Sequence, residues 1–205
     1  SWQAQYYIEK TFSAPLPAAE LTLSLYWRNS AWPNEGRNHL YLKKADGRIA
    51  AGIRPSIYYT ALYYDGGSVS IPTMPLDDQW HLITLTYSQT SAVFYLDGEI
   101  KAVFNGDYTI KSPITDLEMK GENWPVDMDE LAIWPRALSG AEVAEIYNSN
   151  APLKPYTAPV QPEPARLIHL WHFDDGAGAT ATDSAGATML SPIAKWAEGK
   201  FGKGI

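Results

Sequence analysis

Apolar and polar residues alternate along several short stretches of this chain, a pattern typical of β-strands with one buried face. The clearest example is residues 21–27, where leucine or tryptophan occupies every second position. Other stretches are rich in aromatic and branched residues and are bounded by turn residues. We expect further strands at residues 40–42, 49–53, 57–64, 80–87, 92–96, 99–104 and 126–134.

Two Asp-Gly pairs, Asp46-Gly47 and Asp97-Gly98, lie between neighbouring predicted strands. A two-residue type I′ turn needs positive φ at both central positions, and Asp-Gly is a pair that tolerates this requirement. Both pairs therefore predict β-hairpins.

One short helix is expected near residues 139–148. The sequence Ser139-Gly-Ala-Glu142 fits a capping box, in which the serine hydroxyl accepts a hydrogen bond from the Glu142 amide. In return, the glutamate side chain reaches back to the start of the helix. Apolar residues then recur at helical spacing, so one face of this helix should be buried.

The last part of the chain reads like the beginning of a domain. Residues 167–176 predict a strand that runs into a turn, although they come late in the sequence. Joining Ile205 to Ser1 would give one uninterrupted domain pattern. We therefore divide the chain into a main body at residues 1–150, a Pro-rich linker at 151–166 and the opening strands of a sandwich at 167–205.

The composition is that of a folded protein with an acidic balance. Among 205 residues, 45% are hydrophobic and 13% aromatic, the formal net charge is −7 and cysteine is absent. The negative charge and the lack of a Lys/Arg cluster argue against nucleic-acid binding. No apolar run approaches about 18 residues, so we expect no membrane insertion. The absence of cysteine excludes disulfides and thiolate metal sites.

Three groups of residues together resemble laminin-G-like jelly rolls of the concanavalin A type. Residues 80–87, followed by 93–98, resemble the paired central strands of that family. Residues 128–139 resemble its closing strand and the start of its helix, and 170–176 with 182–186 and 199–202 resemble its opening. The resemblance covers nearly the whole chain once the order is rotated. It implies an all-β fold, an antiparallel β-sandwich jelly roll with the one short helix.

In that family the opening segment precedes the body, whereas here residues 167–205 follow it. Two arrangements satisfy this order. The segment returns to its own body, or it completes the next subunit, because an incomplete sheet offers unpaired backbone groups to an added strand. The Pro-rich spacer favours the second arrangement. The expected anchors of the donated strands are Ile168, Leu170, Trp171, Phe173 and Trp196, with the two tryptophans buried most deeply.

The four histidines are scattered and lack the spacing of a metal site. The family resemblance instead implies a calcium site that joins the closing strand to an early loop. The matching residues are Asp129 and Asp183, with Asp127 as a helper. Ala187-Thr188 stand where the family carries Asn or Asp, and this removes potential ligands. The alternative is that Asp183 is a turn residue and Asp129 a solvated strand carboxylate.

Catalysis is not expected. Some glucanases with a concanavalin A-type fold carry their acids as alternating strand residues, and residues 127–130 are the nearest match. This stretch resembles the closing strand of the laminin-G family rather than a catalytic strand. We therefore expect no enzyme.

Aromatic side chains are candidates for stacking on sugar rings. The candidate glycan contacts are Trp32, Tyr58, Tyr59, Tyr63 and Tyr64. Because alternating tyrosines in a strand commonly pack against the opposite sheet, ordinary packing is the alternative explanation.

These observations predict a non-catalytic protein that is extracellular or attached to the cell surface. The chain starts with Ser1 rather than Met, which fits a processed or excised segment. The favoured function is a structural subunit of a filament or repeat array, in which copies assemble head-to-tail by donating residues 167–205. The alternative is a monomeric carbohydrate-binding, lectin-like module, with or without calcium, whose C-terminal segment docks on its own body.

Overall fold

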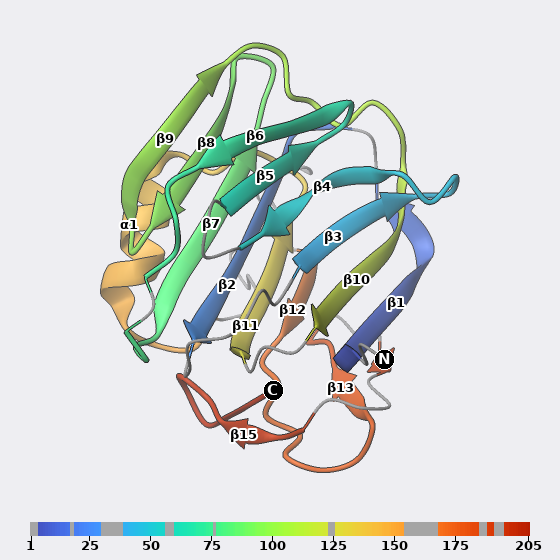
Figure 1. Cartoon of the computed structure of the whole chain (residues 1–205), viewed down its shortest axis with the longest axis vertical. Coiled ribbons are helices and arrows are strands. Elements are labelled where there is room, and N and C mark those ends of the chain that lie inside the picture. The colour runs from blue at the N-terminus through green and yellow to red at the C-terminus, as the bar shows by residue number, and fades with distance from the viewer. Residues whose placement is uncertain are drawn as a thin grey trace, which may run out of the picture.

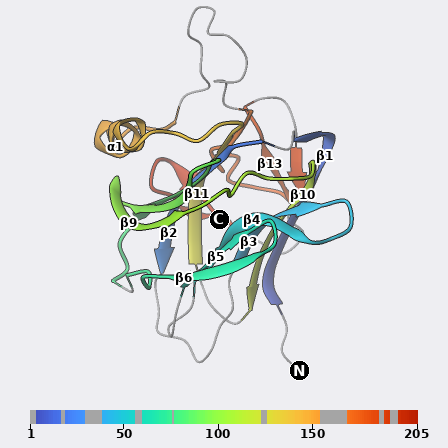
Figure 2. The same ribbon diagram turned by 90° about the horizontal axis from the view of Figure 1, so that it is seen from above.

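The computed structural model is an all-β sandwich of two antiparallel sheets, with one short helix among the residues that it describes, as the sequence predicts. Figure 1 looks onto the larger sheet, and Figure 2 shows helix α1 (Gly140–Ser149) on the far side of the smaller one. The structure describes residues 4–16, 19–29, 39–55, 60–75, 77–122, 126–153, 168–184, 188–190 and 195–205.

All strands pair with antiparallel neighbours. The larger sheet has the order β13 (Thr180–Thr182), β14 (Thr188–Leu190), β1 (Ala4–Leu16), β10 (Ile114–Glu122), β3 (His39–Lys44), β4 (Ile49–Arg54), β5 (Thr60–Tyr64) and β6 (Gly67–Ile71). The smaller sheet has the order β12 (His169–Trp171), β11 (Val126–Trp134), β2 (Leu21–Asn29), β7 (His81–Tyr87), β8 (Ser91–Leu96) and β9 (Glu99–Asn105). A separate pair consists of β15 (Ala197–Glu198) and β16 (Lys203–Gly204).

Strand β2 shows how the alternating pattern becomes a core. Its leucines and Trp27 lie in the main apolar core, with at most 2% of their surface exposed. Thr22 and Tyr26 on the other face are buried as well, because later segments cover them. The Thr22 hydroxyl donates to the Arg136 carbonyl oxygen, and the Tyr26 ring packs edge-on against Phe201. The strand is therefore buried on both faces, and the prediction of a half-buried strand is wrong here.

Both Asp-Gly pairs form hairpins, but their turns differ. Asp97 and Gly98 have φ values of 55° and 78°, as a type I′ turn requires. At the other pair only Gly47 has positive φ (79°), and its N–H donates to the Lys44 carbonyl oxygen. The β3–β4 connection is therefore longer than a two-residue turn.

Strands β1, β6 and β10 are not among the predicted strands. In β10 the buried residues Ile114, Leu117 and Met119 are spaced first by three and then by two residues. The spacing changes because the ladder is irregular after Ile114. Strand β5 begins at Thr60, and the first part of the predicted strand, residues 57–59, lies outside the described residues.

Helix α1 begins with the predicted capping box. The Ser139 hydroxyl accepts a hydrogen bond from the Glu142 amide (3.3 Å), and the Glu142 carboxylate accepts one from the Ser139 amide (2.8 Å). Val143 is buried in a second apolar cluster that includes Val93 and Tyr95 of β8. The helix thus covers the outer face of the smaller sheet.

The C-terminal segment lies against the body of its own chain (orange and red in Figure 1). Strand β12 extends the smaller sheet beside β11, with Trp171 opposite Leu131. Strands β13 and β14 extend the larger sheet. At the far end of the segment, Ile205 exchanges two backbone hydrogen bonds with Met128 of β11. The segment therefore contributes strands to both sheets of its own chain.

The five expected anchors of this segment differ in burial. Trp171 and Phe173 are fully buried in the main core between the sheets. Leu170 points the other way, into the cluster under α1, because successive strand residues face opposite sides. Ile168 and Trp196 pack against the main core but are only half-buried. The expected deep burial of Trp196 is therefore not found.

Candidate functional site

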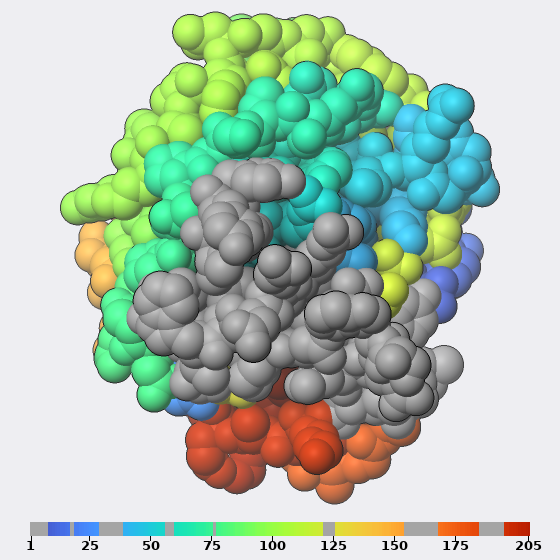
Figure 3. Space-filling view, in the orientation of Figure 1, coloured from blue at the N-terminus to red at the C-terminus, as the bar shows by residue number. Residues whose placement is uncertain are grey.

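An open groove lies between the tips of two neighbouring hairpins of the larger sheet, β3–β4 and β5–β6. The two tips lie side by side at the upper right of Figure 1, and both reach the surface in Figure 3. The groove has a volume of about 620 Å³. It is lined by Lys44, Gly47, Arg48, Ile49, Tyr63, Tyr64, Asp65, Gly66, Gly67 and Ser68.

An ion pair ties one hairpin to the other. Lys44 Nζ lies 2.7 Å from Asp65 Oδ1, and the side chains are only 13% and 10% exposed. The second oxygen of Asp65 accepts a hydrogen bond from the Lys111 amide (2.9 Å). Burial raises the pKa of Asp65, but these two bonds outweigh burial and hold the pKa below its usual value. The two hairpin tips are therefore joined by a satisfied charge pair.

Tyr63 and Tyr64 lie on opposite faces of β5 because they are consecutive in a strand. The Tyr63 ring meets Tyr41 edge-on, with 4.9 Å between centroids, on the outer face. The Tyr64 ring meets Tyr108 in the same way at 4.9 Å and packs against the main core. Both rings are half-buried. Each is thus fixed by an aromatic neighbour while part of its surface reaches the groove.

A buried tyrosine of the smaller sheet holds the backbone beneath Tyr63. The Tyr87 hydroxyl donates to the Tyr63 carbonyl oxygen (2.9 Å) and accepts from the Gly52 amide (3.1 Å). Gly52 has a φ of 151°, and a Cβ there would lie 2.2 Å from the Leu40 carbonyl oxygen, so only glycine fits. Burial raises the pKa of Tyr87, so this hydroxyl stays protonated and able to donate.

Two of the five predicted glycan contacts, Tyr63 and Tyr64, line this groove. The other three, Trp32, Tyr58 and Tyr59, lie outside the described residues. Sequence reasoning missed the polar residues of the groove. In the sequence, Asp46-Gly47 lies at one of its two turns and Asp65-Gly-Gly67 at the other, but nothing in the sequence indicates that these turns are neighbours.

The structure does not bring the three predicted calcium ligands together into a metal site. Asp127 pairs with Arg28 (2.8 Å), Asp183 pairs with His169 (2.6 Å), and Asp129 is buried elsewhere in β11. Across the described residues, no group of three or more His, Asp or Glu side chains is placed to hold a metal ion. Calcium binding stays a prediction.

Two consecutive buried acids of β11, Asp129 and Glu130, form hydrogen bonds with segments that follow β11 in the sequence. Asp129 accepts hydrogen bonds from the amides of Glu130 and Phe201 (2.9 Å each), and burial raises its pKa to about 7. Glu130, at a φ of 52°, lies 2.6 Å from His172 Nδ1 and accepts from the Leu153 amide. Sequence reasoning missed Glu130 as a structural residue. Its signal was an acid directly after Asp129, which breaks the alternation of apolar and polar residues that begins at Val126.

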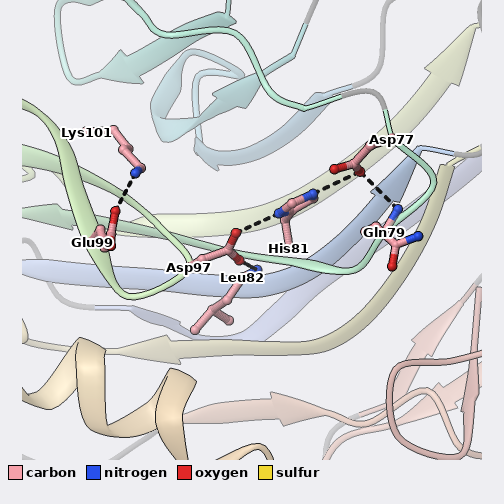
Figure 4. Close-up of polar contacts among 7 residues, drawn as sticks. All are labelled: Asp77, Gln79, His81, Leu82, Asp97, Glu99 and Lys101. Carbon is pink, nitrogen blue, oxygen red and sulfur yellow. Dashed lines mark hydrogen bonds and ion pairs between the residues drawn. The ribbon is translucent and has the colours of Figure 1, made fainter.

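His81 lies in a carboxylate cluster at the start of β7 (Figure 4). Its Nδ1 is 2.7 Å from Asp97 and its Nε2 is 3.0 Å from Asp77. Asp97 also accepts the Leu82 amide, so the cluster ties the β8–β9 turn to the chain that enters β7. The bond to Asp97 is the largest cause that raises the pKa of His81, against the effect of burial. Both ring nitrogens are occupied, so His81 has a structural role in this cluster.

Residues 4–144 match the family model described as the concanavalin A-like lectin/glucanases superfamily, Laminin_G_3. A comparison with curated proteins gives no match.

Several solved structures share the fold. A protein from Bacteroides ovatus aligns over 91% of this chain with a TM-score of 0.62 and 14% identity. Its name provisionally describes it as a carbohydrate-binding protein. A structure of botulinum neurotoxin type C aligns over 70% (TM-score 0.55, 11% identity), and Trypanosoma rangeli sialidase over 64% (TM-score 0.53, 16% identity). The aligned region spans 56%, 42% and 23% of those chains, respectively. At such identities the likeness concerns the fold alone.

Proposed function

Because the chain belongs to the concanavalin A-like lectin/glucanase superfamily, we propose that it is a non-catalytic carbohydrate-binding module whose ligand lies in the groove between the β3–β4 and β5–β6 tips. The observation that carries this proposal is that Tyr63 and Tyr64, from opposite faces of β5, line one groove together with Lys44, Asp65 and Ser68. Two similar structures point in the same direction. The Bacteroides ovatus protein is named for carbohydrate binding, and cell entry of the neurotoxin is described as dependent on two ganglioside molecules.

The dimensions and chemistry of the groove suit a sugar. Small-molecule sites typically enclose about 300–1,000 Å³ and combine aromatic surface with a few fixed polar groups. The groove's volume of about 620 Å³ lies within this range. Aromatic rings pack against the apolar faces of sugar rings, while hydroxyl and charged side chains bond to the sugar hydroxyls.

Several contacts support a binding role over a catalytic one. A glycosidase needs two carboxyl groups facing each other across the scissile bond. Asp127 is paired with Arg28, Asp129 is buried and accepts two backbone amides, and Asp65 in the groove is paired with Lys44. Within the part of the chain that the structure describes, each of these three acids is thus already engaged by a cation or by backbone amides.

The docked C-terminal segment favours a monomer over a head-to-tail filament. In the structure the segment that a filament would donate is paired with its own β11. Self-assembly therefore has no supporting observation here. We further propose an extracellular or cell-surface location for this module. The one helix found in the described residues is too short to cross a membrane.

The test is binding to an array of neutral and acidic oligosaccharides, followed by calorimetry on the strongest ligand. Tyr63→Ala should weaken binding about tenfold or more, because a fixed aromatic contact is lost. Tyr147→Ala is the matched control, since this tyrosine is exposed on α1 and does not line the groove. Thermal melting should show that both variants are folded. Equal affinity of Tyr63→Ala and the unmodified protein would contradict the proposed site.

A further inference from the structure

We propose that the groove selects a sugar that carries a carboxylate, and that Arg48 is the residue that recognises it. This inference rests on the proposed carbohydrate-binding function and specifies the class of ligand. Three features support it: the charges that line the groove, the exposure of the Arg48 side chain and its place on the β3–β4 turn.

The side chains that line the groove carry two cations and one carboxylate. Lys44 and Asp65 neutralise each other at 2.7 Å, and both are largely buried. Of the three charged side chains, Arg48 is therefore the one that remains accessible to a ligand. The lining side chains therefore sum to one positive charge, although the whole chain has a formal charge of −7. The Asp46 carboxylate beside Arg48 offsets part of this charge. Because the chain as a whole is negatively charged, the rest of its surface would not attract an acidic polymer. A preference for acidic sugars must therefore come from a local contact.

Arg48 is held loosely. Its side chain is 80% exposed, and its ion-pair partner within the described residues is Asp46, at 3.7 Å from Nε to Oδ2. Exposed pairs of this kind contribute little, so a ligand can replace this one at low cost. The guanidinium offers a planar fork of N–H donors that matches the two oxygens of a carboxylate.

The backbone keeps Arg48 at the groove while its side chain remains free. The Lys44 amide donates to the Arg48 carbonyl oxygen (2.9 Å), and the Arg48 amide donates to Asp46 Oδ1 (3.0 Å). The neighbouring Gly47 adds no side chain that would block access. A sugar that packs on Tyr63 in the same groove would thus present its carboxylate to the Arg48 guanidinium. The backbone of Arg48 is held in place by the turn.

The experiment uses pairs of probes that differ only in the carboxylate. Oligogalacturonate, oligoglucuronate and oligomannuronate are each compared by calorimetry with their carboxyl-reduced, neutral forms. The acidic form of at least one pair should bind about tenfold more tightly than its reduced form. In Arg48→Gln this preference should fall to about twofold or less. Arg48→Lys should keep part of it, because lysine retains the charge but not the fork.

Two further variants sharpen the test. Asp46→Asn removes the competing carboxylate but keeps an acceptor for the Arg48 amide, so it should strengthen binding of the acidic probe a few-fold. Lys101→Gln is the matched control, because Lys101 also forms an exposed ion pair (with Glu99) but lies on β9, away from the groove. It should leave the preference unchanged.

The possible results separate this inference from the proposed function. Equal binding of acidic and reduced probes would overturn the inference and leave carbohydrate binding intact. A preference that survives in Arg48→Gln would overturn the assignment to Arg48. If no acidic or neutral sugar binds, the proposed function fails, and the inference fails with it.

Discussion

The Tyr87 hydroxyl connects the two sheets at a single atom. It bridges the Gly52 amide and the Tyr63 carbonyl oxygen, which belong to neighbouring strands β4 and β5. The ring itself is fully buried in the core. This contact lies directly beneath the proposed sugar-binding residue, so it affects both stability and the position of Tyr63.

Replacing this hydroxyl tests both roles. Tyr87→Phe leaves the Gly52 amide and the Tyr63 carbonyl oxygen without the bridging partner, which should lower the free energy of unfolding by about 1–3 kcal/mol. Urea denaturation measures this change. We also expect weaker sugar binding, and Tyr147→Phe on the exposed face of α1 serves as the control. An unchanged unfolding free energy would show that the bridge contributes nothing.

A second residue-scale prediction concerns His81. Asp97 and Asp77 favour the charged imidazolium, so the pKa of His81 in the folded protein lies above 6.5. A raised pKa contributes stability that is fully present below about pH 6.5 and is lost as the pH rises through the folded-state value. The difference in unfolding free energy between the unmodified protein and His81→Gln should be largest below about pH 6.5 and shrink as the pH rises through the raised pKa of the folded state. Urea titrations across this range measure it, and a difference that does not vary with pH would contradict the prediction.

At the scale of elements, the two tryptophans of the C-terminal segment form a natural comparison. Trp171 is fully buried opposite Leu131, whereas Trp196 is half-buried against the rim of the core. Trp171→Ala should cost about 3–5 kcal/mol of unfolding free energy through the cavity that it creates. Trp196→Ala should cost clearly less, because less apolar surface is lost. Equal losses in denaturant titrations would contradict this difference in burial.

How far the elements could be predicted depends on the regularity of their pattern. Strand β2 alternates cleanly, most of β7 does so as well, and β8 and β9 flank Asp97-Gly98, so the sequence located all four. Strand β10 was missed because an irregular ladder shifts its buried residues out of strict alternation. Strand β6 was missed because Gly67-Ser-Val-Ser carries little apolar surface. Local pattern thus predicts regular strands but not those that depend on their neighbours.

The candidate site was predictable only in part, for the same reason. Tyr63 and Tyr64 stood out as aromatic residues, whereas the role of Arg48 depends on which hairpins lie side by side. The bond from Gly52 to Tyr87 joins residues 35 positions apart in different sheets. The buried acid Glu130 acquires its role from an irregular step in β11, with positive φ. Such relations arise from tertiary packing, which a single sequence does not display.

For the whole molecule, the docked C-terminal segment predicts a monomer. Residues 168–205 supply β12 beside β11 and the backbone bonds of Ile205 to Met128, so the edge that would accept a donated strand is occupied. Light scattering should give one mass that does not change with concentration. An added free peptide of residues 167–205 should leave this mass unchanged. A ladder of sizes that the peptide shortens would instead support head-to-tail donation.

The placement of β12, β13 and β14 also has a consequence for how the protein is made. A ribosome releases β11 and β1 long before it releases the strands that flank them in the finished sandwich. Until then each sheet has an unpaired edge strand. The strands that pair with these edges are distant in sequence, and this distance slows folding. Nascent chains should therefore depend on chaperones most strongly in the interval between the release of β11 and the release of β12, β13 and β14.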